Sequence, residues 1–465
     1  MKIAIPRLTF RLHDNPLLEN SSAVVVIIEK ERLPTEDYDV FMENMNWNYQ
    51  QYNLLLQTIK GHSNDLSVPL YLCYADKKEI PLLLSALKKA GVSSIETDYM
   101  SDPIFSEFDN AIKVAFPDTK MTNTFTLLDW RTPDHLKVLG DYYKKAKPFS
   151  KLTPLKEYIV DQMEQSKKDL KMVPDFAEPS DLSNTVSQWM VDIDSELKTL
   201  SEKMSNLGMT VHHFGHKEQG NFDKQLLSHA DKSIDLIDGD RWYKPSTARG
   251  LEWDLKTCMK GMNTSQLSPF LSVGSLSAKY FWNKIETSNT KIGSAKDQLM
   301  WRETFNATAI GADCFKDDPK QKRLPHFWSD DITSPFLDHK AVEYEWEKDL
   351  KLIEDWQKGD IEGDAGNSMK TLWENGWIHH LQRHLVADTL TRGSLGQMWT
   401  EGMYWFRYTL LDHDSAVNRA NWMWLSAVAF SSKQKAYHYG KDYISRPQGT
   451  PPGLKPIDRK SGTCK

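Results

Sequence analysis

Short apolar runs rich in β-branched residues recur through the first 130 residues, and no other feature constrains the fold of this chain so strongly. Five of these runs have the length of strands: KIAI (2–5), AVVVIIE (23–29), PLYLCYA (69–75), VSSIET (92–97) and TFTLL (124–128). The segment KKEIPLLLSALKKAG (77–91) has apolar residues at helical spacing and ends at a glycine. Strands that alternate with helices predict a parallel sheet covered on both faces. We therefore expect a Rossmann-like α/β domain over residues 1–130.

The sequence changes character twice after residue 130. Residues 131–220 are polar and charged, which predicts a surface linker between two domains. Residues 221–430 combine helical spacing with many of the 16 tryptophans, so we expect an all-α second domain there. The short tail, 431–465, is rich in proline, glycine and charge, and we expect it to be partly disordered.

Charge and cysteine content limit the classes of protein that fit. The 58 Lys and Arg against 64 Asp and Glu give a net charge of −6, so contact with nucleic acid would need a local basic surface. Cys73, Cys258, Cys314 and Cys464 form no CxxC pair, which indicates a reduced, intracellular protein without a structural metal site. No apolar run approaches the roughly 20 residues of a membrane span. We expect no membrane contact, and a nuclear location in a eukaryote or a cytoplasmic one otherwise.

The segment GWIHHLQRHLVAD (376–388) places three histidines and an arginine inside an otherwise apolar helical pattern. At about 100° per residue, His380, His384 and Asp388 share one stripe, and Arg383 lies beside it. An i, i+4 histidine pair is a metal-ligand spacing, yet the glutamate of HExxH and a third ligand are missing, so we expect no metal. Two interpretations stay open from these residues alone: hydrogen-bonded core histidines, or a pair of proton donors facing a cavity.

Two further segments carry polar groups that could form a site. In LLDHDSAVNRANWMWLS (410–426), Asp412 and Asp414 precede Asn418. These acids would form a buried, paired network with Arg383 if the helices pack together, and the alternative is a surface acidic turn before a core helix. The segment NTSQLSPFLSVGSLS (263–277) offers hydroxyls and amides at a helix start, where a phosphate can bind, although Ser and Thr are also ordinary caps.

Six segments occur together in a recognisable order. They are FRLHDNPLL (10–18), TSQLSPFLSVGSLS (264–277), QLMWRETF (298–305), GWIHHLQRH (376–384), LTRGSLGQMWTEG (390–402) and NWMWLS (421–426). With them the chain resembles the photolyase and cryptochrome family, and within it the (6-4) photolyase and animal-cryptochrome branch. The resemblance implies an α/β domain, often with an antenna chromophore whose identity stays open here, and a helical domain that binds FAD.

The resemblance also implies which residues would hold the cofactor. It matches Arg383 and Asp412 to an ion pair beside the flavin, Asp414 to a position near the ring, and Asn418 to the position facing flavin N5. The other expected cofactor-binding residues are Thr264, Ser265, Leu267 and Ser268, around the FAD phosphates, with Gln298 and Arg302.

Three tryptophans match the family's electron-transfer chain by their spacing. They are Trp422, Trp399 and Trp346. An excited flavin can oxidise an indole, and rings in near contact can carry the oxidised state to the surface. Core packing is the alternative for each ring.

The histidines resemble the (6-4) branch, in which repair needs a proton delivered to the lesion. His380 and His384 would be the catalytic residues, and Gln298, Trp301 and Trp424 would meet the lesion. The leading hypothesis is therefore a light-driven, FAD-dependent enzyme, a DNA photolyase, that repairs the (6-4) photoproduct in ultraviolet-damaged DNA and acts as a monomer. Two alternatives stay open: a cryptochrome photoreceptor or regulator without repair, and a cyclobutane pyrimidine dimer photolyase.

Other parts of the sequence support or complicate this hypothesis. The run KDDPKQKRLPHFW (316–328) supplies Lys320, Lys322 and Arg323 as candidate phosphate contacts, although a solvated charge run is the commoner meaning. The sequence departs from the family at Ser415 to Ala420, where Arg419 and Ala420 follow Asn418, and at Asn367, which stands where the family has an acid.

Overall fold

The structure is a computed structural model of the chain, and it describes residues 1–145, 153–165, 170–214, 222–235, 265–287, 293–337 and 346–430, with two short strands at 457–458 and 463–464. These residues form two compact units. The first unit combines Met1–Asp129 with Gln162–Trp301, and the second combines Trp130–Asp161 with Arg302–Lys465. Each unit is described below by itself.

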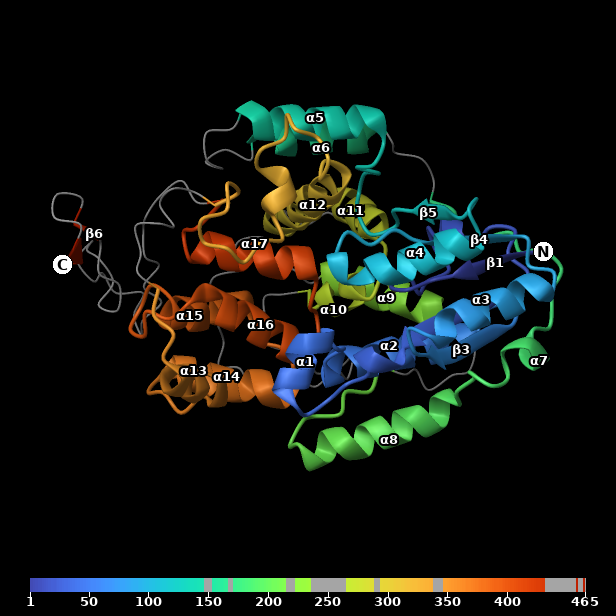
Figure 1. Cartoon of the computed structure of the whole chain (residues 1–465), viewed down its shortest axis with the longest axis horizontal. Helices are drawn as coiled ribbons and strands as arrows, with labels where there is room; N and C mark the ends of the chain where they lie inside the picture. The colour runs from blue at the N-terminus through green and yellow to red at the C-terminus, as the bar shows by residue number, and fades with distance from the viewer. Residues whose placement is uncertain are drawn as a thin grey trace. The chain divides into compact units, whose positions relative to one another are not determined.

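A five-stranded parallel sheet forms the centre of the first unit (Figure 1). Its strands are β1 (Lys2–Ile5), β2 (Val24–Glu29), β3 (Leu70–Ala75), β4 (Ser94–Asp98) and β5 (Lys120–Thr122), in the order β3-β2-β1-β4-β5. Every residue of β2 is buried, as expected for a central strand of a parallel sheet. The α/β prediction is confirmed, and four of the five predicted strands are present.

The fifth predicted strand, at 124–128, is wrong. The strand in that region is β5, which ends at Thr122, and the following residues turn instead of pairing. The Asn123 side chain accepts a hydrogen bond from the backbone N–H of Phe125, and the Thr126 hydroxyl donates to the carbonyl of Leu128 at 2.6 Å. Short polar side chains that satisfy nearby backbone groups compete with sheet hydrogen bonds, which explains the difference.

Helix α3 (Glu79–Lys89) shows why the N-terminal helices pack on the sheet. Its apolar residues Ile80, Leu83, Leu84 and Leu87 fall at helical spacing and are buried in the core beside the strands. Gly91, at φ +92°, ends the helix in a backbone conformation that glycine adopts most easily. The other described helices of this unit are α1 (Tyr38–Asn44), α2 (Tyr49–Ser63), α4 (Ser106–Ala115), α7 (Ser183–Val186), α8 (Ile193–Asn206), α9 (Phe222–Asp235), α10 (Ser268–Ser272) and α11 (Ala278–Thr287).

The described residues of the range 131–220, which was expected as a surface linker, form four helices. Besides α7 and α8 these are α5 (Pro133–Lys145) and α6 (Thr153–Gln165). Leu139 and Tyr143 of α5 are buried, and the Tyr143 hydroxyl lies 2.5 Å from that of Thr308 in the second unit, to which both belong. The many charged residues of this range cover the outer faces of amphipathic helices, so composition alone suggested an irregular connection. The boundary predicted at 130 lies one residue from a limit of the first unit, at Asp129, whereas no limit of either unit falls at 220. The predicted division into domains stays a prediction.

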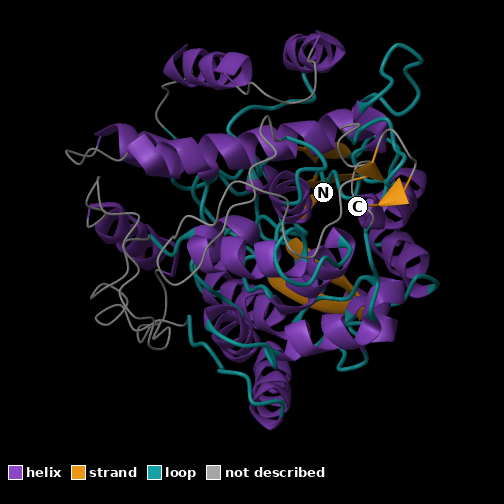
Figure 2. Ribbon diagram, turned by 90° about the vertical axis from the view of Figure 1, so that its left-hand side faces the viewer, coloured by secondary structure: helices purple, strands orange, loops and turns teal. Residues whose placement is uncertain are grey.

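The second unit has a described core of helices. Helices, drawn in purple, also predominate in the chain as a whole (Figure 2). The main helices of the second unit are α13 (Leu350–Lys358), α14 (Asp364–Asn375), α15 (His380–Leu390), α16 (Trp399–Thr409) and α17 (Ser415–Leu425), together with α12 (Gly293–Cys314) from Arg302 onward. The all-α prediction for 221–430 is confirmed for the described residues of that range. Trp356, Trp399 and Trp422 are almost fully buried in this core.

The predicted tail is described only in part. The partly disordered tail predicted at 431–465 lies outside the described residues, apart from the backbone of β6 (Ile457–Asp458) and β7 (Thr463–Cys464), which pair antiparallel. Within the described ranges we find no helix with the length and apolar composition that crossing a membrane requires.

Gly402 sets how closely α16 and α17 approach each other. A methyl group added at Gly402 would lie 2.1 Å from the indole of Trp422, well inside van der Waals contact. Gly402→Ala should therefore lower the free energy of unfolding by about 1–3 kcal/mol, as overpacking does, despite the better helix propensity of alanine. Urea denaturation measures the change.

Gly140→Ala in α5 is the matched control for this substitution. There the nearest atoms are side-chain ends of Gln321 and Phe315, both at 3.1 Å, and these can adjust. Gly140→Ala should change stability little. Equal effects of the two substitutions would contradict the tight helix contact.

Candidate functional site

Helix α15 begins at His380, so Trp377, Ile378 and His379 precede it as an extended connection. Gly376, at φ +66°, ends α14, and its carbonyl accepts a hydrogen bond from the backbone N–H of Leu411 at 2.7 Å. This bond ties the start of α15 to the segment that leads into α17. The two polar motifs of the sequence are thereby brought side by side.

The predicted ion pair between Arg383 and Asp412 is present. The Arg383 Nη2 atom lies 2.9 Å from Asp412 Oδ2, and Arg383 Nε donates to the carbonyl of Ile378 at 3.0 Å. The guanidinium also lies 5.8 Å from the Trp377 ring centroid. The Asp412 side chain is 2% exposed and that of Arg383 is 23% exposed. A charge-assisted hydrogen bond to a carboxylate so little exposed to water holds the guanidinium in place. Part of the Arg383 side chain remains exposed.

Asp414 has two tasks at the start of α17. Its Oδ1 atom accepts the backbone N–H of Val417 at 3.1 Å and so caps the helix. Its Oδ2 atom lies 3.5 Å from Arg302 Nη2 and accepts from the Asn306 amide at 3.2 Å. The acidic-turn and paired-network interpretations are therefore both partly right. Asn306 was missed from the sequence, although it lies one helical turn after Arg302 and on the same face of α12.

Asn418 is held one turn further along α17. Its side-chain amide donates to the carbonyl of Met403 on α16 at 2.9 Å, and the residue is 9% exposed. This contact orients the amide and directs its donor toward the neighbouring helix. The amide oxygen can then act as an acceptor for a ligand.

Three histidine rings form a cluster with Trp424. The ring centroids of His379 and His380 are 4.3 Å apart, those of His380 and His384 are 5.9 Å apart, and His384 lies 5.5 Å from Trp424. His380, His384 and Trp424 come together as predicted, whereas His379 was missed as a member. Its position next to His380 in the sequence was the available signal.

Burial controls the protonation of this cluster. Desolvation lowers the pKa of His380 to about 3, and it lowers the pKa values of His379 and His384 to about 4, with a further contribution from nearby Arg383. All three rings are therefore neutral at pH 7 in the protein without a bound anion. A histidine that titrates near neutrality was expected here, and low dielectric and neighbouring positive charge explain why the structure differs.

Acidification should therefore destabilise the protein through these rings. In the unfolded chain they bind protons below about pH 6.5, but in the folded chain only below about pH 4. The unfolded state binds more protons within that window, so the free energy of unfolding contributed by the rings falls as the pH drops from about 6.5 to about 4. Urea denaturation at pH 7 and pH 5 measures this loss.

The variant His379→Asn should lose less stability than the parent between those two pH values. A comparison of variants is needed because burial raises the pKa of Asp388 to about 7, which acts in the opposite direction. If the parent and His379→Asn show the same pH dependence, the buried ring carries no such linkage.

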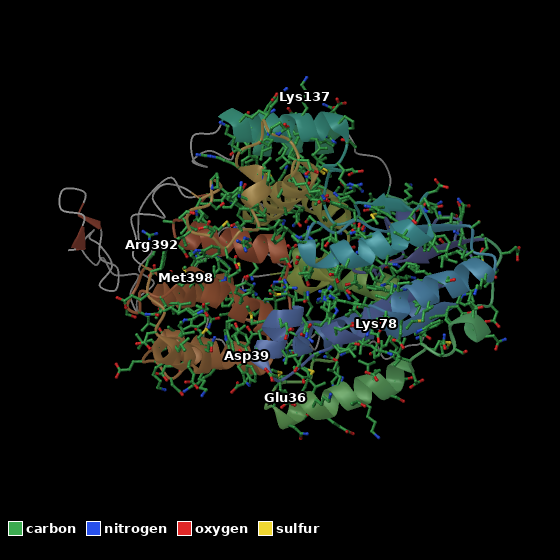
Figure 3. All side chains as sticks on the ribbon, viewed as in Figure 1. Glu36, Asp39, Lys78, Lys137, Arg392 and Met398 are labelled. Carbon is green, nitrogen blue, oxygen red and sulfur yellow. The ribbon has the colours of Figure 1, made fainter. Side chains whose placement is uncertain are left out.

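The predicted tryptophan chain is only partly contiguous. Trp422 makes ring contacts with Trp356, at 6.2 Å and 77°, and with Phe406, at 5.0 Å. Trp399 lies on α16 and is fully buried. Trp346 is half-buried. The carbonyl of the next residue, Glu347, accepts the backbone N–H of Met398 at 2.9 Å, and Met398, which is labelled in Figure 3, directly precedes Trp399. Trp356 was not among the predicted electron-transfer residues, yet its indole ring contacts that of Trp422.

The other predicted site residues are more dispersed. Ser265, Leu267, Ser268, Gln298 and Trp301 belong to the first unit, and Thr264 lies outside the described residues. The predicted helix start at Ser268 is present, although α10 has only five residues. Lys320 and Lys322 are exposed and Arg323 is half-buried, in the segment between α12 and the short 3₁₀ helix η4 (Leu324–His326) of the second unit.

The structure describes the surroundings of Arg419 and Asn367, two residues at which the sequence departs from the family pattern. The Nε atom of Arg419 donates to the carbonyl of Phe327 at 2.6 Å. Asn367 lies in the first turn of α14, where its carbonyl accepts the hydroxyl of Thr371 at 2.9 Å. Across the residues that the structure describes, no group of three or more His, Cys, Asp or Glu side chains could hold a metal ion.

Comparison with known proteins connects this geometry to a family. Residues 295–443 match the family model described as the FAD binding domain of DNA photolyase. A (6-4) DNA photolyase of Arabidopsis thaliana is 33% identical over 175 residues, which are 36% of this chain and 28% of that protein. Cryptochrome-2 of Gallus gallus is 34% identical over 172 residues, 35% of this chain and 27% of that protein. The match thus spans about a quarter of the length of these curated relatives.

The fold is similar over nearly the whole chain. The crystal structure of a bacterial class III photolyase from Agrobacterium tumefaciens superposes with a TM-score of 0.61 and covers 92% of this chain and 80% of that one, at 20% identity. Over residues 295–443 the chain is therefore similar to the FAD binding domain of DNA photolyase, and its fold over nearly the whole length is that of solved photolyase structures.

The residues of the helical unit fit FAD. A guanidinium that is 23% exposed is held in place by a carboxylate that is 2% exposed, and this arrangement presents a fixed donor. The Asn418 oxygen and the partly exposed Trp424 ring add an acceptor and an aromatic surface. Such groups are compatible with a flavin ring, which carries carbonyl oxygens and a ring N–H group.

Proposed function

We propose that the chain is a light-driven, FAD-dependent photolyase that repairs the (6-4) photoproduct in ultraviolet-damaged DNA. The observation that carries the proposal is the His380–His384 pair beside Trp424. Arg383 and Asn418 lie on the same two helices, and Asp412 lies in the turn that leads into the second of them. The similarity to a (6-4) DNA photolyase supports it. Bound FAD would supply the electron that starts repair when it absorbs light.

The residues proposed to hold FAD are those that the helices fix by hydrogen bonds. Arg383, Asp412, Asp414, Asn418 and Arg302 belong to the helical unit, and Ser265, Leu267, Ser268 and Gln298, with Thr264, are proposed from the first unit. Each group in the helical unit is oriented by a neighbour before any ligand binds, which lowers the entropy cost of binding.

The proposed role of His380 and His384 is to hold and move a proton. Reversing the (6-4) lesion moves an oxygen group between two bases, so a proton must be delivered at a defined position. Both rings are neutral at pH 7, because burial lowers the pKa of each. A DNA phosphate or an anionic cofactor nearby raises the pKa of a histidine, so the bound partner itself would charge the donor.

The proposed DNA contacts combine charge with flipping of the damaged bases. Lys320, Lys322 and Arg323 would meet phosphates, which give affinity without sequence preference. Damaged bases pair and stack poorly, so turning them out of the duplex costs less than for normal bases. Trp301, Trp424 and Gln298 are proposed to receive them. We further propose that the protein acts as a monomer inside the cell, in the nucleus if the source is a eukaryote.

A cryptochrome photoreceptor or regulator without repair is the second candidate. The similarity to Cryptochrome-2 favours it as strongly as the photolyase match favours repair, because the identities are 34% and 33%. The two functions differ in one measurable outcome.

A repair assay separates the candidates. The purified chain, with its flavin reduced, is incubated with oligonucleotides that contain one (6-4) photoproduct or one cyclobutane dimer, in blue light and in the dark. The proposal expects light-dependent restoration of the (6-4) lesion alone. Binding without repair would favour the cryptochrome function, and restoration of the cyclobutane dimer alone would identify the other photolyase class.

A further inference from the structure

The guanidinium of Arg419 lies over the ring of Trp399. Its central carbon is 5.5 Å from the ring centroid, and its side chain is 5% exposed. Acceptors on the segment 327–330 hold the group in place: Nε donates to the carbonyl of Phe327 at 2.6 Å, and Nη1 lies 2.7 Å from Asp330 Oδ1. Arg419 is one residue beyond Asn418 and belongs to the stretch in which this chain departs from its family.

The charge of Arg419 acts strongly on Trp399. The carboxylate of Asp330 is 42% exposed, so water screens it, whereas the guanidinium is buried against the ring. A neutral indole is attracted by this cation, but an indole that has lost one electron is itself a cation and is repelled. The Trp399 N–H is buried and has no hydrogen-bond acceptor among the described residues, so no nearby group relieves the positive charge.

Trp356 has the opposite surroundings. Its ring contacts that of Trp422 at 6.2 Å, and its indole N–H donates to the carbonyl of Val386 at 2.9 Å. A carbonyl acceptor stabilises positive charge that develops on the indole. Among the described residues no cation lies over this ring, and both Trp356 and Trp399 are fully buried. The two rings therefore differ in charge environment and not in exposure.

We propose that Arg419 raises the energy of oxidised Trp399, so that the oxidised state stays on the Trp422–Trp356 pair and does not pass to Trp399. This inference rests on the proposed flavin photochemistry. Trp422 would give one electron to the light-excited cofactor and recover one electron from Trp356. A thiol in solution would return one electron to the pair and lose a proton, and two of the thiyl radicals so formed would couple to a disulfide. Arg419 acts as a positioning residue for charge and touches neither FAD nor DNA.

The test compares Arg419→Met with Arg419→Lys. Both variants lose the forked hydrogen bonds, but only the methionine variant loses the charge. Under blue light with a thiol, Arg419→Met should reduce the flavin about tenfold faster than the parent, the change that each ~1.4 kcal/mol of barrier produces. Arg419→Lys should remain near the parent. Adding Trp399→Phe should abolish the gain of Arg419→Met, while Trp399→Phe alone should leave the parental rate nearly unchanged.

A second measurement does not depend on flavin photochemistry. The full-length protein is exposed in the dark to azide radicals, which remove one electron from tryptophan, and oxidised indoles are located by mass spectrometry. In the parent, Trp356 should be oxidised more than Trp399. In Arg419→Met, the fraction of oxidation found at Trp399 should increase. Equal oxidation of the two rings in the parent, or slow photoreduction in Trp399→Phe alone, would overturn the inference. A protein without photoreduction but with the expected dark pattern would contradict the proposed function and leave the charge effect standing.

Discussion

Replacing His384 by asparagine is expected to slow repair of the (6-4) photoproduct by ~10²- to 10⁴-fold, the range that a positioned general acid supplies. His384 lies 5.9 Å from His380 and 5.5 Å from Trp424, so it borders both the second histidine and the aromatic surface proposed to meet the lesion. Asparagine keeps a polar side chain but cannot carry the proton. His380→Asn should behave in the same way. Chromatography of illuminated, lesion-containing oligonucleotides measures the rate.

His379→Asn is the matched control for the two histidine variants. Its ring is half-buried and contacts that of His380, but it precedes α15 and lies outside the i, i+4 pair. It should reduce repair far less than His384→Asn. All three variants should keep their flavin and bind damaged DNA nearly as the parent does, because phosphate contacts and base flipping supply most of that affinity. Parental repair by His384→Asn would show that these histidines are core residues.

The second large effect concerns retention of FAD. Asp412→Ala removes the carboxylate that fixes Arg383, and breaking a buried ion pair costs roughly 3–5 kcal/mol. If that cost falls on the cofactor complex, FAD binding should weaken by ~10²-fold or more, since each 1.4 kcal/mol is tenfold. The purified variant should be nearly colourless. FAD released on denaturation, per mole of protein, measures the effect.

Two variants make the FAD experiment specific. Asp412→Asn keeps a hydrogen-bond acceptor for Arg383 but removes the charge, and it should fall between the parent and the alanine variant. Asp364→Ala removes an exposed acid at the start of α14 and should leave the FAD content unchanged. An equal FAD content in Asp412→Ala and the parent would contradict the assignment of the Arg383–Asp412 pair to the cofactor.

The sequence predicts structure best where a pattern is local. Strands such as β2 are continuous apolar runs, and α3 repeats its leucines at helical spacing, so both were predictable. The run at 124–128 failed because the side chains of Asn123 and Thr126 bind nearby backbone groups, which hydrophobicity does not register. The helices within 131–220 were missed because their apolar faces are diluted by charge.

The candidate site was predictable only through whole motifs. Arg383 and Asp412 are 29 residues apart, and recognising both motifs was enough to expect them together. Asn306 and Arg419 could not be predicted in this way. Their contacts depend on which faces of α12, α16 and α17 meet, and that is decided by packing over the whole unit. The low pKa values of the histidines likewise follow from burial, which no local pattern reveals.

The double role of Asp414 has a consequence for engineering this protein. One carboxylate oxygen holds the first turn of α17 and the other holds Arg302 and Asn306 of α12. Asn418 and Trp422 follow on that same helix at successive turns, so their positions share a single anchor. A substitution that changes the charge at Asp414 would also change the position of α17 relative to α12. The electrostatic environment of a cofactor therefore cannot be altered at this residue without also moving Asn418 and Trp422.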